Sequence, residues 1–183
     1  MSRGLGDVYK RQNVYNALAA ICVGREFDVP MDKIAEGIRS FELTKMRLAV
    51  EEYNGITIIN DCYNASPDSI KAALGVLADT DKNRKVAILG DVLEMGDFAK
   101  DAHYNLGKVV KESGVDLLIT AGENMKYLAQ GAKDNGVENI VSFDKTLEVC
   151  NYVKAEIKSG DAVLIKASRG MHFEEVYNTI KNK

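Results

Sequence analysis

The segment 58-IINDCYNASPDSIKAAL-74 decides the fold, because it joins an apolar strand to the start of a helix. Two isoleucines lead directly into the hydrogen-bonding side chains of residues 60–64, and Ser66 or Pro67 is expected to begin a helix. A buried polar group without a partner costs about 1–3 kcal/mol. Either the turn satisfies these groups internally or a ligand does.

Outward from this segment, short apolar runs alternate with helical patterns. The expected strands are KVAILG (85–90), VDLLITAG (115–122), NIVSF (139–143) and DAVLIKAS (161–168). The expected helices are residues 66–78, 99–113, 124–135, 147–158 and 171–181. The stretch 48-LAVEEYNGITIIND-61 predicts two strands joined by a tight hairpin at Asn54–Gly55. The alternation predicts an α/β fold: an open, mostly parallel sheet with helices on both faces.

Two amphipathic helices are expected before this domain, in 13-NVYNALAAICVGREF-27 and 30-PMDKIAEGIRSF-41, with a boundary near Thr44–Arg47. The last six of residues 1–12, DVYKRQ, are what GAT GTG TAT AAG AGA CAG encodes, which looks like a transposon end used in sequencing libraries. We expect residues 1–12 to be an artefactual leader and the chain to be a fragment. The alternative is a genuine basic tail.

Composition excludes several classes of protein. The chain has 183 residues, 46% hydrophobic and 28% charged, which is typical of a globular protein rather than a disordered one. A net charge of −3 gives no electrostatic reason to expect nucleic acid or an anionic membrane as a partner. No apolar run is long enough to span a bilayer. The three cysteines lack C-x-x-C spacing, so we expect reduced thiols in the cytoplasm.

Polar or glycine-rich loops follow four of the expected strands. These are NDCYNAS (60–66), GDVLEMG (90–96), AGEN (121–124) and KASRG (166–170). In open α/β sheets ligands bind outside the carboxyl ends of the strands. We therefore expect a binding site on this edge.

Each candidate side chain also has a purely structural interpretation. Ser66 and Asp68 suit a helix N-terminus, as a cap and a first-turn acid. Asp91 and Glu94 could be Mg²⁺ ligands or part of a solvated loop. Lys166 and Arg169 flank Ser168 before a helix, which suits an anion, but they could equally be surface charges. His103 and His172 are too isolated for a metal site and are expected to be exposed or half-buried helix residues.

Several of these motifs together resemble the Mur ligase family, and within it the branch that adds D-alanyl-D-alanine to the peptidoglycan precursor. The resemblance runs in order from Asn13 to the C-terminus. It rests on NVYNALAA, TKMRLAVEEYNG, IINDCYNASPDSIKAAL, AILGDVLEMG, His103 and LIKASRGMHFEEV. It implies that residues 13–44 end a central ATPase domain and that residues 45–183 form a Rossmann-like C-terminal domain.

The resemblance also implies the reaction. ATP phosphorylates the carboxylate of UDP-N-acetylmuramoyl-tripeptide, and the amine of D-alanyl-D-alanine then attacks the acyl phosphate. The family acts as a cytoplasmic monomer and requires Mg²⁺, which binds mainly in the central domain. No G-x-x-x-x-G-K-[ST] motif occurs in this chain, so the phosphate-cradling P-loop is expected upstream and the fragment alone is expected to be inactive.

The resemblance assigns roles residue by residue. Asn16 matches an asparagine that contacts the adenine, Arg47 an arginine that reaches the ATP phosphates, and Asp61 an acid near the ribose. Tyr63 and Asn64 fall in the loop that faces the reaction centre.

Further roles follow at the next strand ends. Lys166, Ser168 and Arg169 fall in a catalytic motif near the incoming dipeptide or the acyl acceptor. Asp91 and Glu94 are assigned to substrate binding, and no residue is assigned to a metal. Two alternatives remain: another ligase of the superfamily, of the folylpolyglutamate or cyanophycin synthetase type, or a non-catalytic Rossmann-like binding module.

Overall fold

The computed structural model describes the backbone of residues 5–41 and 46–183, and the side chains from residue 14 onward within those ranges. The chain divides into two compact units, Met1–Thr44 and Lys45–Lys183. The first contains the helices α1 (Leu5–Glu26) and α2 (Met31–Arg39). The two helices pack closely: a Cβ atom added at Gly24 of α1 would lie only 2.7 Å from Cδ1 of Ile34 in α2. Helix α1 begins before Asn13, the first residue that the sequence pattern assigned to it.

The second unit begins with the hairpin that the sequence predicts. Strands β1 (Ala49–Tyr53) and β2 (Ile56–Asn60) pair in antiparallel register, with Tyr53 opposite Ile56. Asn54 and Gly55 have φ angles of 50° and 79°. Two successive positive φ angles are what a type I′ turn requires, which is why Asn-Gly favours it.

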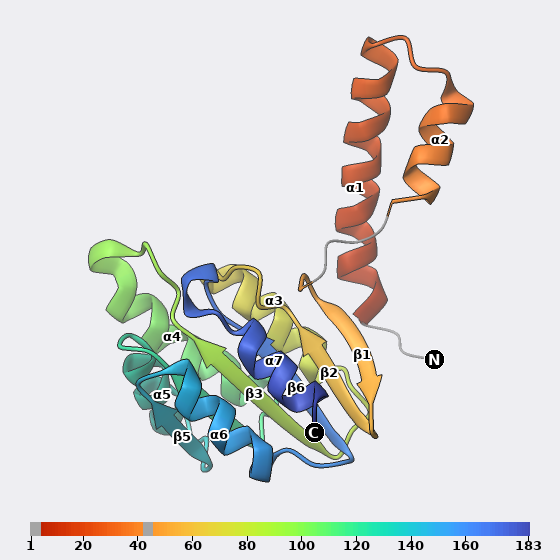
Figure 1. Cartoon of the computed structure of the whole chain (residues 1–183). Coiled ribbons are helices and arrows are strands. Elements are labelled where there is room, and N and C mark those ends of the chain that lie inside the picture. The colour runs from red at the N-terminus through yellow and green to blue at the C-terminus, as the bar shows by residue number, and fades with distance from the viewer. Residues whose placement is uncertain (1–4, 42–45) are drawn as a thin grey trace. The chain divides into compact units, whose positions relative to one another are not determined.

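A six-stranded sheet with the order β1-β2-β6-β3-β4-β5 forms the centre of this unit (Figure 1). Its other strands are β3 (Arg84–Gly90), β4 (Leu117–Ala121), β5 (Ile140–Phe143) and β6 (Asp161–Lys166). All neighbours pair in parallel except β1 with β2. Strand β6 comes last in the chain, yet it lies between β2 and β3 in the sheet.

Helices cover both faces of the sheet. One face carries α3 (Pro67–Ala78), α4 (Ala99–Glu112) and α5 (Met125–Asp134), and the other carries α6 (Thr146–Glu156) and α7 (Glu174–Lys181). Two short 3₁₀ helices, η1 (Gly96–Phe98) and η2 (Arg169–Met171), precede α4 and α7. The expected open, mostly parallel Rossmann-like sheet is confirmed, and α3 to α6 lie close to their expected ranges.

The central strands contribute to two hydrophobic cores, one on each face. In β3, Val86 and Ile88 point to the core beneath α6 and α7, while Ala87 and Leu89 point to the core beneath α3, α4 and α5. This explains why the strands are continuous apolar runs rather than alternating ones. Within the described residues, no helix combines the length and apolar character needed to cross a membrane.

Helices α4 and α5 approach each other through glycines. A Cβ atom added at Gly107 would lie 2.1 Å from the backbone nitrogen of Ala132, and one added at Gly131 would lie 2.1 Å from the carbonyl oxygen of Tyr104. Such contacts are possible only without a side chain, so these two glycines set the spacing of the two helices.

We expect Gly107→Ala to lower the free energy of unfolding by about 1–3 kcal/mol, because the added methyl group forces the helices apart. Gly75→Ala is the matched control: it lies in helix α3, and an added Cβ atom meets nothing within 4 Å. That variant should gain up to about 1 kcal/mol from helix propensity. Urea unfolding of both variants measures the difference, and equal effects would contradict the close packing.

Candidate active site

Three loops meet at the carboxyl edge of the sheet, because β2, β6 and β3 are neighbours in it. Backbone hydrogen bonds link these strand ends: Asp61 N–H donates to the carbonyl of Ile165 in β6 at 2.9 Å, and Ser168 N–H donates to the carbonyl of Asp91 at 3.1 Å. The chain leaves β2 and β3 towards one face and β6 towards the other. A crevice at such a switch point is where open α/β sheets bind ligands.

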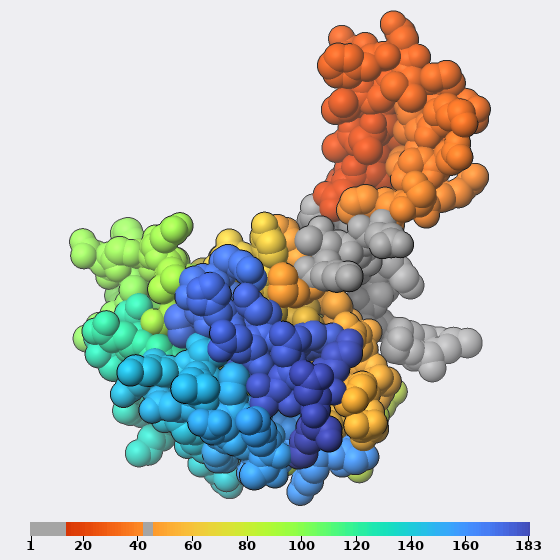
Figure 2. Space-filling view, viewed as in Figure 1, coloured from red at the N-terminus to blue at the C-terminus, as the bar shows by residue number. Residues whose placement is uncertain are grey.

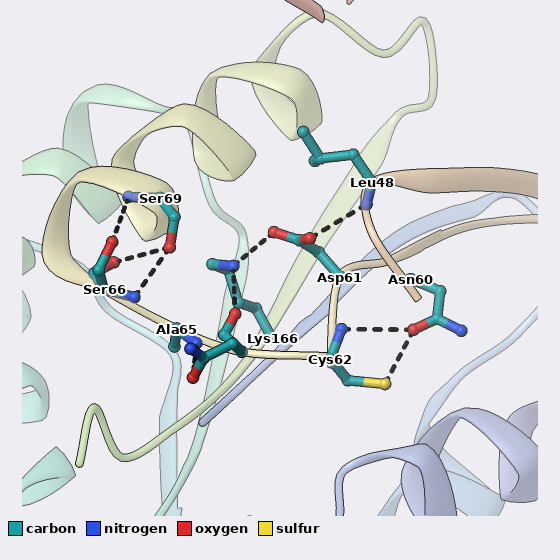
Figure 3. Close-up of polar contacts among 9 residues, drawn as sticks. Leu48, Asn60, Asp61, Cys62, Ala65, Ser66, Ser69 and Lys166 are labelled. Carbon is teal, nitrogen blue, oxygen red and sulfur yellow. Dashed lines mark hydrogen bonds and ion pairs between the residues drawn. The ribbon is translucent and has the colours of Figure 1, made fainter. Parts of the chain in front are cut away.

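A buried ion pair joins the ends of β2 and β6. The side chain of Lys166 is 1% exposed and that of Asp61 is 12% exposed. The Lys166 ammonium donates to Asp61 Oδ2 and, at 2.9 Å, to the carbonyl oxygen of Asn64 (Figure 3). The other carboxylate oxygen, Oδ1, accepts the backbone N–H of Leu48 at 3.0 Å. Asp61 thus connects the start of the second unit to the centre of its sheet.

Burial is the largest influence on the Asp61 carboxyl and raises its pKa. The Lys166 ammonium, the Leu48 N–H and the Arg47 guanidinium all favour the charged form and oppose that rise. The negative charge of Asp61 therefore depends on the cation beside it.

The turn after β2 satisfies much of its own polar content. Asn60 Oδ1 accepts the backbone N–H of Cys62 at 3.4 Å and its thiol at 2.9 Å, and Asn64 Oδ1 accepts the N–H of Ala65 at 2.9 Å (Figure 3). Burial raises the pKa of the Cys62 thiol to about 11, so this thiol stays protonated at neutral pH. Internal bonding therefore accounts for Asn60 and for the side chain of Asn64.

The interpretation of Ser66 as a helix cap is confirmed. Its hydroxyl accepts the N–H of Ser69 at 3.2 Å, and the Ser69 hydroxyl accepts the N–H of Ser66 at 2.8 Å. This reciprocal capping box, with Pro67 in the first turn, begins α3. Asp68 lies in the same first turn, where a negative charge complements the helix dipole.

Arg47 and Tyr63 form an exposed pair beside Asp61. The guanidinium carbon of Arg47 lies 4.4 Å from the centre of the Tyr63 ring, which is a cation–π contact. Met46 and Leu48, on either side of Arg47, have positive φ angles of 69° and 47°, which are unfavourable for residues with a side chain. Bonds from Leu48 N–H to Asp61 and from Tyr63 N–H to the Met46 carbonyl hold this conformation.

Asp91 lies at the end of β3 and is 5% exposed. Its Oδ1 accepts the backbone N–H groups of Asn124 and Met125, each at 3.0 Å, so it caps helix α5 from another element. A Cβ atom added at Gly122 would lie 2.4 Å from the Asp91 carboxyl carbon, so the glycine makes room for it. Glu94, by contrast, is exposed, with a φ of 63°. The two acids therefore do not form one site through their side chains.

Ser168 and Arg169 differ in their surroundings. Ser168 is 5% exposed, and its hydroxyl accepts the N–H of Leu93 at 3.0 Å. The segment after β6 reaches the surface (Figure 2), where the Arg169 side chain is 53% exposed and pairs with Glu174 at 3.2 Å. Arg169 thus presents a cation at the surface, whereas Ser168 holds the neighbouring loop.

The expected helix start at Met171 is wrong, and α7 begins at Glu174. His172 has a left-handed conformation, φ 53°, which separates the 3₁₀ turn η2 from α7. The first turn of α7 also carries Glu174 and Glu175. The negative charges of these two acids match the positive end of the α7 dipole.

The expectation for the histidines is only partly confirmed. His103 lies in a helix but is buried, at 1% exposed, whereas His172 is exposed, with a side chain that is 66% exposed, but lies outside a regular helix. The spacing of His103 from Leu106 and Val110 places it on the buried face of α4, and that periodicity could have revealed it.

Other expectations concern residues outside these loops. Asn16 is exposed in α1, within the first unit, and its proposed nucleotide contact stays a prediction. Among the described residues, no group of three or more His, Cys, Asp or Glu side chains could hold a metal ion. A separate pocket of about 380 Å³ opens at the ends of β4 and β5, and Asp61 and Lys166 do not line it.

Two ligases are similar to this chain over most of its length. UDP-N-acetylmuramoyl-tripeptide–D-alanyl-D-alanine ligase of Bacillus subtilis is 36% identical over 169 residues, which cover 91% of this chain and 37% of the relative. Crystal structure II of MurF from Acinetobacter baumannii has a TM-score of 0.78 at 27% identity and covers 92% of this chain and 37% of that one.

A third comparison concerns the fold alone. MurF ligase of Thermotoga maritima, solved in complex with ADP, has a TM-score of 0.68 at 24% identity and covers 88% of this chain and 36% of that one. The chain thus spans little more than a third of the length of these relatives.

The family model described as "Mur ligase, glutamate ligase domain" matches residues 46–169. That range contains Arg47, the ion pair of Asp61 and Lys166, and the exposed Arg169 that the geometry brings to one edge. The chain therefore belongs to the Mur ligase family.

Proposed function

We propose that this chain is the C-terminal portion of a cytoplasmic, monomeric ligase that adds D-alanyl-D-alanine to UDP-N-acetylmuramoyl-tripeptide at the expense of ATP. The observation that carries the proposal is the 36% identity to a ligase of that name across 91% of this chain. The same match favours this function over a folylpolyglutamate or cyanophycin synthetase and over a non-catalytic binding module. The three free cysteines suit a reducing compartment.

The strand-end residues fit a nucleotide. Arg47 is exposed and always charged, so its guanidinium can pair with phosphate oxygens. Within the described residues, each Asp61 oxygen accepts one bond and has a second lone pair, which could accept a ribose hydroxyl. Asn16 would contact the adenine. Mg²⁺ would neutralise phosphate charge and would be held mainly by residues outside this chain.

The reaction needs positioning more than covalent chemistry by the protein. The terminal phosphoryl group of ATP passes to the tripeptide carboxylate, which forms an acyl phosphate and ADP. The dipeptide amine attacks the carbonyl carbon, and the tetrahedral intermediate expels phosphate and loses the amine proton. We assign Arg169 to an anionic group of the reactants, with Tyr63, Asn64 and Glu94 lining the approach. Lys166, Ser168 and Asp91 would hold these loops in place.

The full-length ligase that carries this chain provides the direct test. Phosphate release should require ATP, UDP-N-acetylmuramoyl-tripeptide and D-alanyl-D-alanine together, because the acyl phosphate forms on one substrate and is consumed by the other. Replacing the dipeptide with glutamate tests the polyglutamate alternative. Release with glutamate but not with the dipeptide would overturn the proposal.

Removing the cation of the buried ion pair should produce pH-dependent instability. We expect Lys166→Met to cost about 3–5 kcal/mol at pH 7, because the buried Asp61 carboxylate then has no counter-charge. Since burial raises the folded-state pKa of Asp61 above its unfolded value, the folded state binds more protons, and stability falls as pH rises through that window. Without Lys166 the folded-state pKa of Asp61 rises further, so the pH range over which stability falls extends to higher pH.

Chemical denaturation at several pH values measures this effect. The deficit of Lys166→Met should shrink as the pH is lowered towards about 4, where Asp61 can be protonated in both states. The double variant Asp61→Asn/Lys166→Met is the control and should show little of this pH dependence. A deficit that stays constant with pH would contradict a charge-based cause.

Arg169→Ala in the full-length ligase should lower kcat/KM by about ten- to a hundredfold, the size of one lost charge-assisted hydrogen bond. Stability should fall by about 1 kcal/mol or less, because the pair with Glu174 is half exposed. Lys108→Ala is the matched control: it removes another exposed cation that pairs with a glutamate, but on α4. Normal kinetics with a large stability loss would show that Arg169 only anchors α7.

A further inference from the structure

His103 has both ring nitrogens engaged inside the protein. Nδ1 lies 2.6 Å from the carbonyl oxygen of Ala99, one turn earlier in α4, and Nε2 accepts the backbone N–H of Val92 at 3.1 Å. Because a backbone N–H can only donate, Nε2 is unprotonated and Nδ1 carries the hydrogen. The ring is therefore held in one tautomer, with its acceptor directed at the loop after β3.

Successive residues of that loop bind different elements: Asp91 and Leu93 bind the segment after β6, and Val92, between them, binds α4. The carbonyl of Asp91 accepts Ser168 N–H at 3.1 Å, Val92 N–H donates to His103, and Leu93 N–H donates to the Ser168 hydroxyl at 3.0 Å. The Leu93 side chain also covers Gly170, where an added Cβ atom would lie 3.0 Å from Leu93 Cδ1. The position of residues 168–170 thus depends on the conformation of residues 91–93.

The bond to His103 lies at the centre of this arrangement. Val92 is 1% exposed and His103 is 1% exposed, so the N–H between them is removed from water. Without the imidazole acceptor, the buried N–H would be unsatisfied, and the loop would have to move to reach another partner. Such a shift would be passed to Ser168 through Asp91 and Leu93 on either side.

We propose that His103 is a positioning residue for the reaction: through Val92 it fixes the loop of residues 91–93 and, with it, the segment that carries Arg169. This inference rests on the proposed function, since it concerns the same site. His103 itself touches no reactant. It acts through the position of the Arg169 guanidinium. A displacement of about 1 Å at a reacting group can lower the rate by about a hundredfold.

Three variants separate positioning from general stability. His103→Phe keeps a ring of similar size but has no acceptor for Val92 N–H. His103→Gln restores an acceptor, because its amide oxygen reaches about as far from the backbone as Nε2. Val110→Ala is the control: it removes buried apolar volume from the same helix about two turns after His103 and leaves the imidazole acceptor in place, and it should lower the melting temperature.

Amide hydrogen exchange on the 183-residue chain tests the local step. In His103→Phe, the exchange of Val92 and Leu93 should accelerate at least about tenfold more than that of Ile88 in the centre of β3. His103→Gln should recover most of this protection, and Val110→Ala should show no such selective change. Equal acceleration at all three amides in His103→Phe would mean that the histidine is a general core residue, which would overturn the proposal.

Kinetics of the full-length ligase test the consequence for the site. We expect His103→Phe to lower kcat by about tenfold or more, with KM values for ATP, tripeptide and dipeptide changed by less than about threefold. His103→Gln should lie within about threefold of the wild type, and Val110→Ala within about twofold. Unchanged kcat in His103→Phe, or an equal loss in Val110→Ala, would overturn the positioning role.

The two proposals can fail separately. A wild-type ligase that releases no phosphate with the three substrates would overturn the proposed function, while the exchange of Val92 would still report whether His103 holds the loop. An active wild type with a fully active His103→Phe variant would leave the proposed function intact and would remove the inference.

Discussion

The second unit depends on a single electrostatic constraint, the burial of Lys166 at the end of a fully buried strand. All six residues of β6 are buried, and the Lys166 side chain is 1% exposed. An ammonium group in such a place needs a counter-charge, because transferring an unpaired charge out of water costs several kcal/mol. Asp61, which is 105 residues earlier in the chain, supplies it. The pair therefore fixes where the returning strand β6 lies relative to β2.

The same carboxylate extends this constraint to the start of the unit. Through Leu48 N–H, Asp61 holds a segment in which Met46 and Leu48 have unfavourable positive φ angles, and Arg47 between them is directed over Tyr63. The buried Asp61 carboxylate thus helps to position the exposed Arg47 guanidinium. On the other side of β6, a backbone hydrogen bond from Ser168 to Asp91 joins the same framework to the end of β3.

Much of the fold could be predicted from the sequence because its signals are local. The hairpin follows from Asn54–Gly55, and the start of α3 follows from Ser66 and Pro67, whose preferences are set by their own backbone and nearest neighbours. The start of α7 could not be read in this way. His172 takes a left-handed conformation that only its surroundings can impose, and it delays the helix to Glu174.

In the candidate site, too, some features could be predicted from the sequence and others depend on the tertiary structure. The sequence by itself determined which polar side chains follow which strands, and that the strand ends share one edge, because parallel strands joined by helices point the same way. Only the tertiary structure decided which of these groups are engaged. Lys166 and Asp91 are bound inside the protein while Arg47 and Arg169 stay exposed, and His103 is buried and bound to Val92 rather than exposed or half-buried. Pairing and burial depend on contacts between residues far apart in the chain, which residue type and spacing do not specify.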